Sequence, residues 1–165
     1  MDNVQRPVLA TLRITLGVMW FYAAGWKVPP DFGEASGGGL YRFTSMAVDD
    51  PVFGPWSWLV EHLILPNFTL FGWMVLVTEA TLGALLVLGL GTRLVALTGA
   101  GMSLTIFLSV ALAPPEWPWS YVLMIGAHLA VAAAAAGRTW GLDGVIRPMW
   151  AGTDGRVARC VGAVS

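Results

Sequence analysis

The chain has 165 residues, of which 56% are hydrophobic and 12% charged, whereas an ordinary soluble domain carries about 25% charged residues. This composition predicts one small domain whose solvent is mostly lipid. The net charge is −1, and the nine lysines and arginines are scattered rather than clustered, so we expect no nucleic-acid partner. Cys160 is the single cysteine, which excludes an internal disulfide, a CxxC redox pair and a cysteine-rich metal site.

Four segments are apolar enough to cross a membrane, which requires about 20 mostly apolar residues for a hydrocarbon core of about 30 Å. They are residues 7–27, 68–90, 94–113 and 119–136. Arg13 inside the first segment and Lys27 at its end are the wrong charge layout for a secretory signal peptide. We therefore predict an all-α, polytopic membrane protein, built as an antiparallel four-helix transmembrane bundle.

The connections between these segments are very unequal. "GTR" at 91–93 joins the second and third segments and predicts a tight helical hairpin. "PPEWPW" at 114–119 joins the third and fourth, and its prolines should end the third helix. The first two segments are about 40 residues apart, and within this long outer loop "VPPDFGEASGGGL" predicts turns, whereas "FGPWSWLVEHLILPN" predicts a short interfacial helix. This helix either only seals the bundle or contributes to a site.

The positive-inside rule favours a topology with both ends in the cytoplasm. It leaves Lys27 and Arg42 outside, together with most of the acids. The arginines that it places inside are Arg6, Arg13, Arg93, Arg138, Arg147, Arg156 and Arg159. We accordingly predict a multi-pass protein of the cytoplasmic membrane, with a four-span domain over residues 1–145 and a cytoplasmic tail over 146–165.

Each predicted span has one stripe of polar or small residues at helical spacing. The stripes comprise Arg13, Gly17, Trp20, Ala24 and Lys27; Gly72, Val75, Glu79 and Gly83; Thr98, Met102, Thr105 and Ser109; and Tyr121, Met124, His128, Ala132 and Ala135. Because lipid is as apolar as leucine, helices associate in it through close packing and interhelical hydrogen bonds. We therefore expect all four stripes to face inward and form a polar seam.

Glu79 lies in the middle of the second span, where an unpaired charge costs at least about 2.5 to 3.5 kcal/mol. We predict that it belongs to a buried cluster with Arg13 and His128. Two interpretations stay open. In the structural one, Arg13 and Glu79 form an ion pair that fixes helix register, and His128 donates a neutral hydrogen bond. In the functional one, Glu79 and His128 bind the carbonyl head of a quinone or relay its protons.

Lys27 raises a second question, because it ends the first span near the outer surface, where Glu61, His62 and Glu116 are also expected. Its side chain can extend to the lipid head groups, as lysines at span ends commonly do. Alternatively, Lys27 faces an anion at an outer substrate mouth together with Glu61 and His62, with Arg42 as a balancing charge. The sequence alone leaves both interpretations open.

Several motifs, taken in order, resemble those of the DoxX/DoxD family. They are "LRITLGVMWFYAAGWKV", "TEATLGALLVLGLGTRLVAL", "PPEWPWSYVLMI" and "GRTWGLD", and the resemblance extends over residues 8–145. For the DoxD branch it implies a subunit of a thiosulfate:quinone oxidoreductase, which oxidises thiosulfate to tetrathionate on the outer side and passes electrons to membrane quinone. Arg13, Lys27, Glu79 and Arg93 correspond to positions in the motifs of that family.

The resemblance and the polar seam together define the expected site. We expect Glu79, His128 and Arg13 to be catalytic, and Trp20, Glu79 and His128 to hold a quinone. No metal, haem or flavin is expected in this chain, because it has one cysteine, two histidines on different segments and no motif for such a group. Quinone is then either the only cofactor, bound in the bundle, or the redox chemistry belongs to a partner subunit.

Two other functions fit the same residues. The chain could be a non-catalytic membrane anchor that holds a redox or stress enzyme, or a proton or small-anion pathway with Glu79 and His128 as relay groups. The second is disfavoured because Trp20 interrupts the polar column from Arg13 to Lys27. Association into homo-oligomers is left open.

Overall fold

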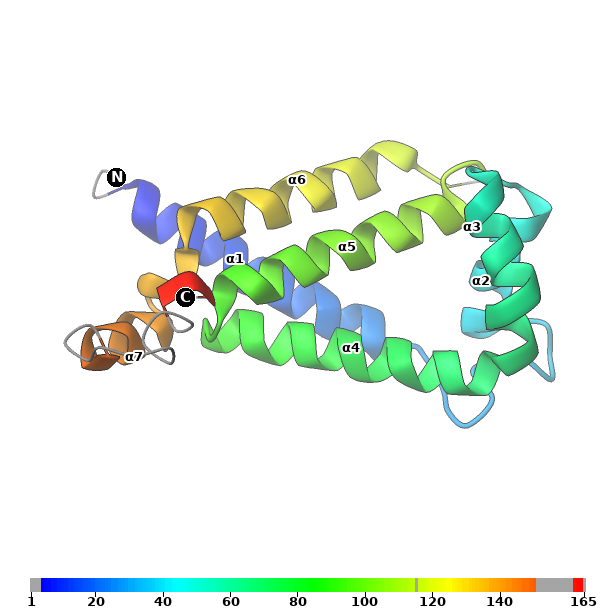
Figure 1. The fold of residues 1–165 in the computed structure, drawn as a ribbon, viewed down its shortest axis with the longest axis horizontal. Helices are drawn as coiled ribbons and strands as arrows, with labels where there is room; N and C mark the ends of the chain where they lie inside the picture. Colours follow the sequence, from blue (N-terminus) through cyan, green and yellow to red (C-terminus); the bar gives the residue numbers. More distant parts are fainter. Residues whose placement is uncertain (1–3, 115, 151–161, 165) are drawn as a thin grey trace.

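The structure of the chain, a computed structural model, describes residues 4–114, 116–150 and 162–164. Within these residues the regular structure is all helical (Figure 1), as the sequence predicts. Cys160, Arg156 and Arg159 lie outside the described residues, with most of the predicted tail. The four long helices are α1 (Gln5–Gly25), α4 (Phe68–Leu88), α5 (Thr92–Val110) and α6 (Pro118–Ala134).

Three helical stretches are long and apolar enough to cross a membrane, namely Gln5–Gly25, Gly54–Leu88 and Thr92–Val110. The fourth predicted span is present as α6, which is apolar but has 17 residues. At 1.5 Å per residue it measures about 25 Å, somewhat less than a typical hydrocarbon core. The chain is thus a helical, multi-pass membrane protein.

The long helices pack as two pairs, α1 with α4 and α5 with α6, and α1 also contacts α6 (Figure 1). Glycine permits the closest approach in the first pair, because a Cβ on Gly17 would lie 2.9 Å from the carbonyl oxygen of Gly83. Between the pairs, Gly89 and Gly91 adopt left-handed conformations and reverse the chain. A continuous core joins all four helices through residues such as Leu16, Leu86 and Val131.

One end of the molecule, the cap end, is covered by the long loop. It contains α2 (Gly39–Asp49), α3 (Gly54–Leu59), a π-helical turn η1 (Val60–Ile64) and a 3-10 turn η2 (Leu65–Asn67). The predicted interfacial helix is helical, but it continues through η1 and η2 into α4 with a bend (Figure 1). The bend follows from Pro66 and from Asn67, whose backbone leaves the helical region. The sequence-based prediction did not include α2.

The opposite end, the hairpin end, holds the turn between α4 and α5, the 3-10 turn η3 (Ala136–Arg138) and α7 (Asp143–Trp150) (Figure 1). The loop between η3 and α7 docks on the hairpin by two backbone hydrogen bonds. Leu142 donates to the carbonyl of Leu88 at 3.0 Å, and Asp143 donates to that of Gly89 at 2.9 Å.

The predicted stripes face inward on α1, α4 and α6, but on α5 the prediction holds only in part, because Met102 packs against the core and Ser109 accepts a hydrogen bond from Trp56 at 3.1 Å, whereas the threonines do not pair with another helix. There Gly99 and Ser103 are buried, whereas Thr98 is exposed. The hydroxyls of Thr98 and Thr105 donate to carbonyls four residues earlier on their own helix, so they need no partner on another helix. Close packing determines the inner face of α5 instead. Gly99 lies against the His128 ring of α6, where a Cβ would overlap the ring.

Candidate functional site

A buried ion pair joins α1 to α4 inside the helical body. The Nζ of Lys27 lies 2.6 Å from Oε2 of Glu79, and the two side chains are 3% and 2% exposed. Lys27 also donates to the carbonyl of Ala23 at 2.7 Å, and its ammonium lies 4.3 Å from the centre of the Trp26 ring. The lysine side chain therefore turns back along α1 toward the interior, which contradicts the interpretation in which it extends to the head groups.

Local sequence explains this position. Lys27 follows the end of α1, and Glu79 lies eleven residues into α4. The Lys27 side chain runs back along α1 by about one turn, to the carbonyl of Ala23, and this brings its ammonium to the level of the Glu79 carboxylate. Phe32 packs on the same face of α4 as Glu79, two turns nearer the cap end. It is 1% exposed, packs at 5.5 Å from Trp73, and fills the space that a Cβ on Gly72 would occupy.

The predicted cluster of Arg13, Glu79 and His128 is wrong, because the three side chains have different partners. Arg13, fully buried, donates through Nη1 to the carbonyl oxygens of Leu86 and Val87 and through Nη2 to that of Trp140 at 3.0 Å. Leu86 and Val87 are in the last turn of α4, where carbonyls lose the partners that they have inside a helix, and the carbonyl of Leu86 accepts in addition from the N–H of Gly89 at 3.3 Å. The guanidinium thus stabilises the negative end of the α4 dipole.

Asp143 completes this arrangement at the hairpin end. Its two carboxylate oxygens accept hydrogen bonds from the backbone N–H groups of Gly91 at 2.8 Å and Thr92 at 2.9 Å, which are the first free donors of α5. Asp143 is 2% exposed. The sequence reasoning did not single out Asp143, although it is the last residue of the "GRTWGLD" motif, a buried acid among arginines.

His128 lies between the two charge sites and pairs with Trp20. The indole Nε1–H of Trp20 donates to Nε2 of His128 at 2.9 Å, so Nε2 is an acceptor. The proton of the neutral ring is therefore on Nδ1, which donates to the carbonyl of Met124 at 2.8 Å. Both ring nitrogens are engaged, and the ring is fully buried.

Glu61 and His62, predicted at a substrate mouth with Lys27, lie on η1 at the cap end. They are exposed and 3.7 Å apart, and His62 stacks on Trp58 at 4.9 Å. Their contacts connect them to each other and to their own helix rather than to Lys27. Within the described residues, no group of three His, Cys, Asp or Glu side chains is placed to hold a metal ion.

These features define a class of protein: a small, multi-pass helical membrane protein with a buried lysine–glutamate pair beneath a helical cap. The particular family follows from residues 43–157, which match the family described as TQO small subunit DoxD. This segment is more than half of the chain, and the protein therefore belongs to the DoxD family. The matched segment includes Glu79, His128 and Asp143, and it leaves out α1 with Arg13, Trp20 and Lys27. No curated protein and no solved structure matches the chain.

Proposed function

We propose that this chain is the membrane subunit of a quinone-linked oxidoreductase that oxidises thiosulfate, and that Lys27 and Glu79 are the residues that interact with the quinone head group. The observation that carries the proposal is the Lys27–Glu79 ion pair, buried in a DoxD-family membrane protein. Ionisable residues inside a membrane are costly, and a functional role is the default hypothesis for them. In this enzyme two thiosulfate ions lose two electrons and join through a new sulfur–sulfur bond as tetrathionate.

The chemistry of the pair fits a quinone head group. Quinone, when bound, supplies an acceptor for two electrons and two protons. Lys27 is a cationic donor that can hydrogen-bond a carbonyl oxygen, and the carboxyl group of Glu79 can hold a proton and release it within the dry interior. Both side chains are almost fully buried, and the loss of surrounding water strengthens both interactions.

Trp20 and His128 fit a head group poorly, although they were predicted to bind it. The indole N–H and both imidazole nitrogens are already paired, so any ligand would have to displace these bonds. We assign them a structural role between α1 and α6. Arg13 likewise acts on backbone carbonyls, at the opposite end of α1 from Lys27.

The proposed orientation places the cap end outside and the hairpin end in the cytoplasm, with α6 as a fourth span completing an antiparallel bundle. Two observations support it. The described arginines Arg93, Arg138 and Arg147 are at the hairpin end, and acids such as Glu61 and Glu116 are at the cap end, in line with the positive-inside rule. This orientation brings the Lys27 end of α1 toward the side where thiosulfate would be oxidised.

The test compares single and double substitutions of the pair in a membrane preparation that contains the chain with its native partners. The readout is thiosulfate-dependent quinone reduction, normalised to folded protein. We expect Glu79→Gln to lower turnover at least tenfold. We also expect Lys27→Met/Glu79→Leu, which replaces the pair by apolar side chains of similar volume, to be folded and inactive, because no protonatable group remains.

A matched control is Glu61→Gln, which removes an exposed acid of the cap without touching the pair. Its turnover should equal that of the wild type. The proposal fails if the folded double variant retains wild-type turnover, since the pair would then serve only to hold α1 on α4. It also fails if deletion of the chain leaves thiosulfate-dependent quinone reduction unchanged.

A second candidate function is a non-catalytic anchor for a redox partner, and it is favoured by the internal pairing of Arg13, Trp20 and His128. Such bonds fix helix positions without exposing a reactive group. An anchor predicts that Glu79→Gln reduces the amount of assembled complex but not turnover per complex. Purification from native membranes followed by mass spectrometry for co-purified proteins and quinone separates the two functions.

A further inference from the structure

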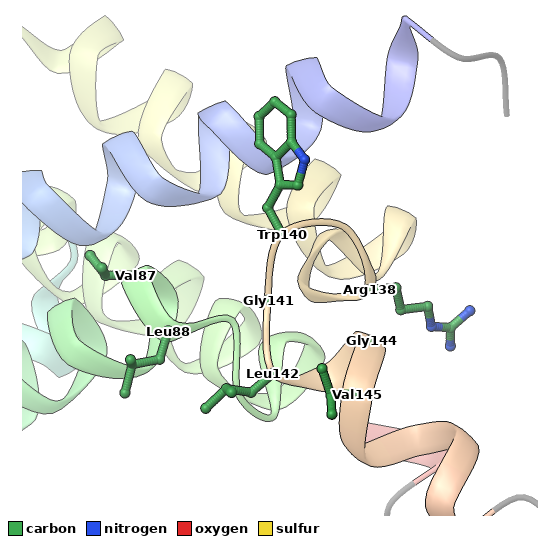
Figure 2. Close-up of a pocket in the computed structure, with 8 residues that line it drawn as sticks. All are labelled: Val87, Leu88, Arg138, Trp140, Gly141, Leu142, Gly144 and Val145. Atoms are coloured by element: carbon green, nitrogen blue, oxygen red, sulfur yellow. The ribbon is translucent and has the colours of Figure 1, made fainter.

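The buried Lys27–Glu79 pair needs a route by which a ligand reaches it, because the two side chains are 3% and 2% exposed. An open hollow of about 570 Å³ lies at the hairpin end, against Val87 and Leu88 of α4 and the loop that leads to α7 (Figure 2). Val87 is eight residues beyond Glu79, which places it about 12 Å further along the helix. The hollow at the hairpin end therefore gives no direct route to the pair.

The ammonium group of Lys27 has three N–H donors, and its neighbours satisfy them unequally. Nζ lies 2.6 Å from the carboxylate of Glu79 and donates to the carbonyl of Ala23 at 2.7 Å. The ring of Trp26 also lies against the ammonium, with its centre 4.3 Å from Nζ. An aromatic ring attracts a cation through its π face, but it has no oxygen to accept a hydrogen bond. Within the described part of the chain, the third donor is thus left with the π face alone.

Trp26 separates this ammonium from the surroundings of the protein. It is 41% exposed, although Lys27 beneath it is buried. The indole contacts Phe43 of α2 edge-on at 5.4 Å, and Phe43 is itself 39% exposed. Beside the indole, Gly25 is exposed, and a Cβ at this position would meet no heavy atom within 4 Å. One half-exposed ring therefore covers the ammonium, with open space next to it.

We propose that Trp26 is a gate between the surrounding lipid and Lys27, and that it opens to admit a quinone head group. The inference rests on the proposed function, in which Lys27 and Glu79 interact with the quinone. When the indole turns away from Nζ, toward the open space at Gly25, the third N–H of Lys27 becomes free to donate to a carbonyl oxygen. The contacts with Glu79 and Ala23 are kept, so the buried ammonium is never left without its carboxylate.

The experiment measures the dissociation constant of a short-chain ubiquinone analogue for the purified full chain by native mass spectrometry, which requires no turnover. Trp26→Ala removes the ring that competes for the ammonium. We expect the dissociation constant to fall roughly twofold to fivefold, the factor that an exposed cation–π contact is worth. Trp119→Ala, which truncates another exposed tryptophan, is the matched control and should bind the analogue like the wild type.

Gly25→Leu acts in the opposite direction and keeps the indole. The added side chain extends into open space, so the fold should persist, but it fills the room into which the indole turns. We expect the dissociation constant to rise roughly threefold, because the apparent affinity falls with the fraction of molecules whose gate is open. Gly126→Leu on α6, where a Cβ also meets no heavy atom within 4 Å, is the control.

In the turnover assay the two gate variants should change KM for the quinone more than kcat. The proposal is overturned if the wild type binds no analogue, if Trp26→Ala and Gly25→Leu bind it like the wild type, or if the controls shift binding equally. Should this occur while Glu79→Gln still loses turnover, only the gate is wrong and the proposed function stands. If Glu79→Gln retains wild-type turnover, the proposed function fails and the gate fails with it.

Discussion

Lys27 and Arg13 belong to one predicted stripe of the first span and are both buried, at 6% and 0% exposure, yet the structure neutralises them in different ways. Lys27 meets the carboxylate of Glu79. Arg13 meets carbonyl oxygens at the end of α4 and at Trp140. The same predicted pattern thus gives one side-chain pair and one cation bound to the backbone. The comparison teaches that helical spacing identifies buried charges but not their partners.

The difference has an energetic consequence. A side-chain ion pair can be replaced as a unit by apolar residues, often without loss of stability, because its two desolvation costs disappear together. Backbone carbonyls cannot be removed by substitution, so no second change can compensate for the loss of Arg13.

The largest effect should follow Arg13→Met, which removes the hydrogen-bond donors of the carbonyls of Leu86, Val87 and Trp140. We expect a loss of about 3 to 5 kcal/mol in the free energy of unfolding, because the carbonyls of Val87 and Trp140 lose the guanidinium donor and that of Leu86 keeps only the N–H of Gly89. Denaturation in detergent micelles, followed by circular dichroism, measures it. Arg6→Met, at an exposed position of the same helix, is the control, and an equal stability of both variants would break the proposed distinction.

Glu79→Leu should cost less, about 2.5 to 3.5 kcal/mol, because it leaves the ammonium of Lys27 buried without its carboxylate. The double variant Lys27→Met/Glu79→Leu should recover most of this loss. A double-mutant cycle on the unfolding free energies gives the coupling between the two residues. If the double variant is less stable than Glu79→Leu alone, Lys27 is held by Ala23 and Trp26 rather than by the pair.

Asp143→Ala sharpens the comparison at the hairpin end, where a carboxylate is bound to backbone N–H groups rather than to a side chain. It removes the acceptors of Gly91 and Thr92 at the start of α5, and a lost helix cap costs about 1 to 2 kcal/mol. The same unfolding experiment measures the change. Thr98→Ala, on the exposed face of α5, should remain within about 0.5 kcal/mol of the wild type. Accelerated hydrogen exchange should be confined to the first turn of α5, and uniform acceleration would argue against a local cap.

Trp20→Phe should give the smallest effect, about 1 kcal/mol, because it removes one hydrogen bond and leaves Nε2 of His128 without its donor while most of the ring volume remains. Thermal unfolding reports the loss, with Trp119→Phe at an exposed position as the control. Nitrogen chemical shifts of the His128 ring should change in the first variant only. An unchanged His128 ring would show that the Trp20 contact does not fix its tautomer.

The sequence by itself determined the helices and their lipid environment, since long apolar runs, prolines and the glycines of the hairpin act locally. It located α1, α4, α5 and α6 to within a few residues and predicted three of the four inward stripes. It also identified Arg13, Glu79 and His128 as unusual buried groups, because each polar residue interrupts an apolar run and requires a partner, but it did not predict the burial of Lys27.

Only the tertiary structure decided which partner each group has. The level at which α1 crosses α4 depends on the approach of Gly17 to Gly83, and this level brings Lys27 to Glu79 and Arg13 to the end of α4. The inner face of α5 was likewise set by the contact of Gly99 with His128 rather than by its hydroxyl groups. Asp143 gained its role from the return of the chain to the hairpin. These relations depend on the relative shift of packed helices, which the period within any one helix does not contain.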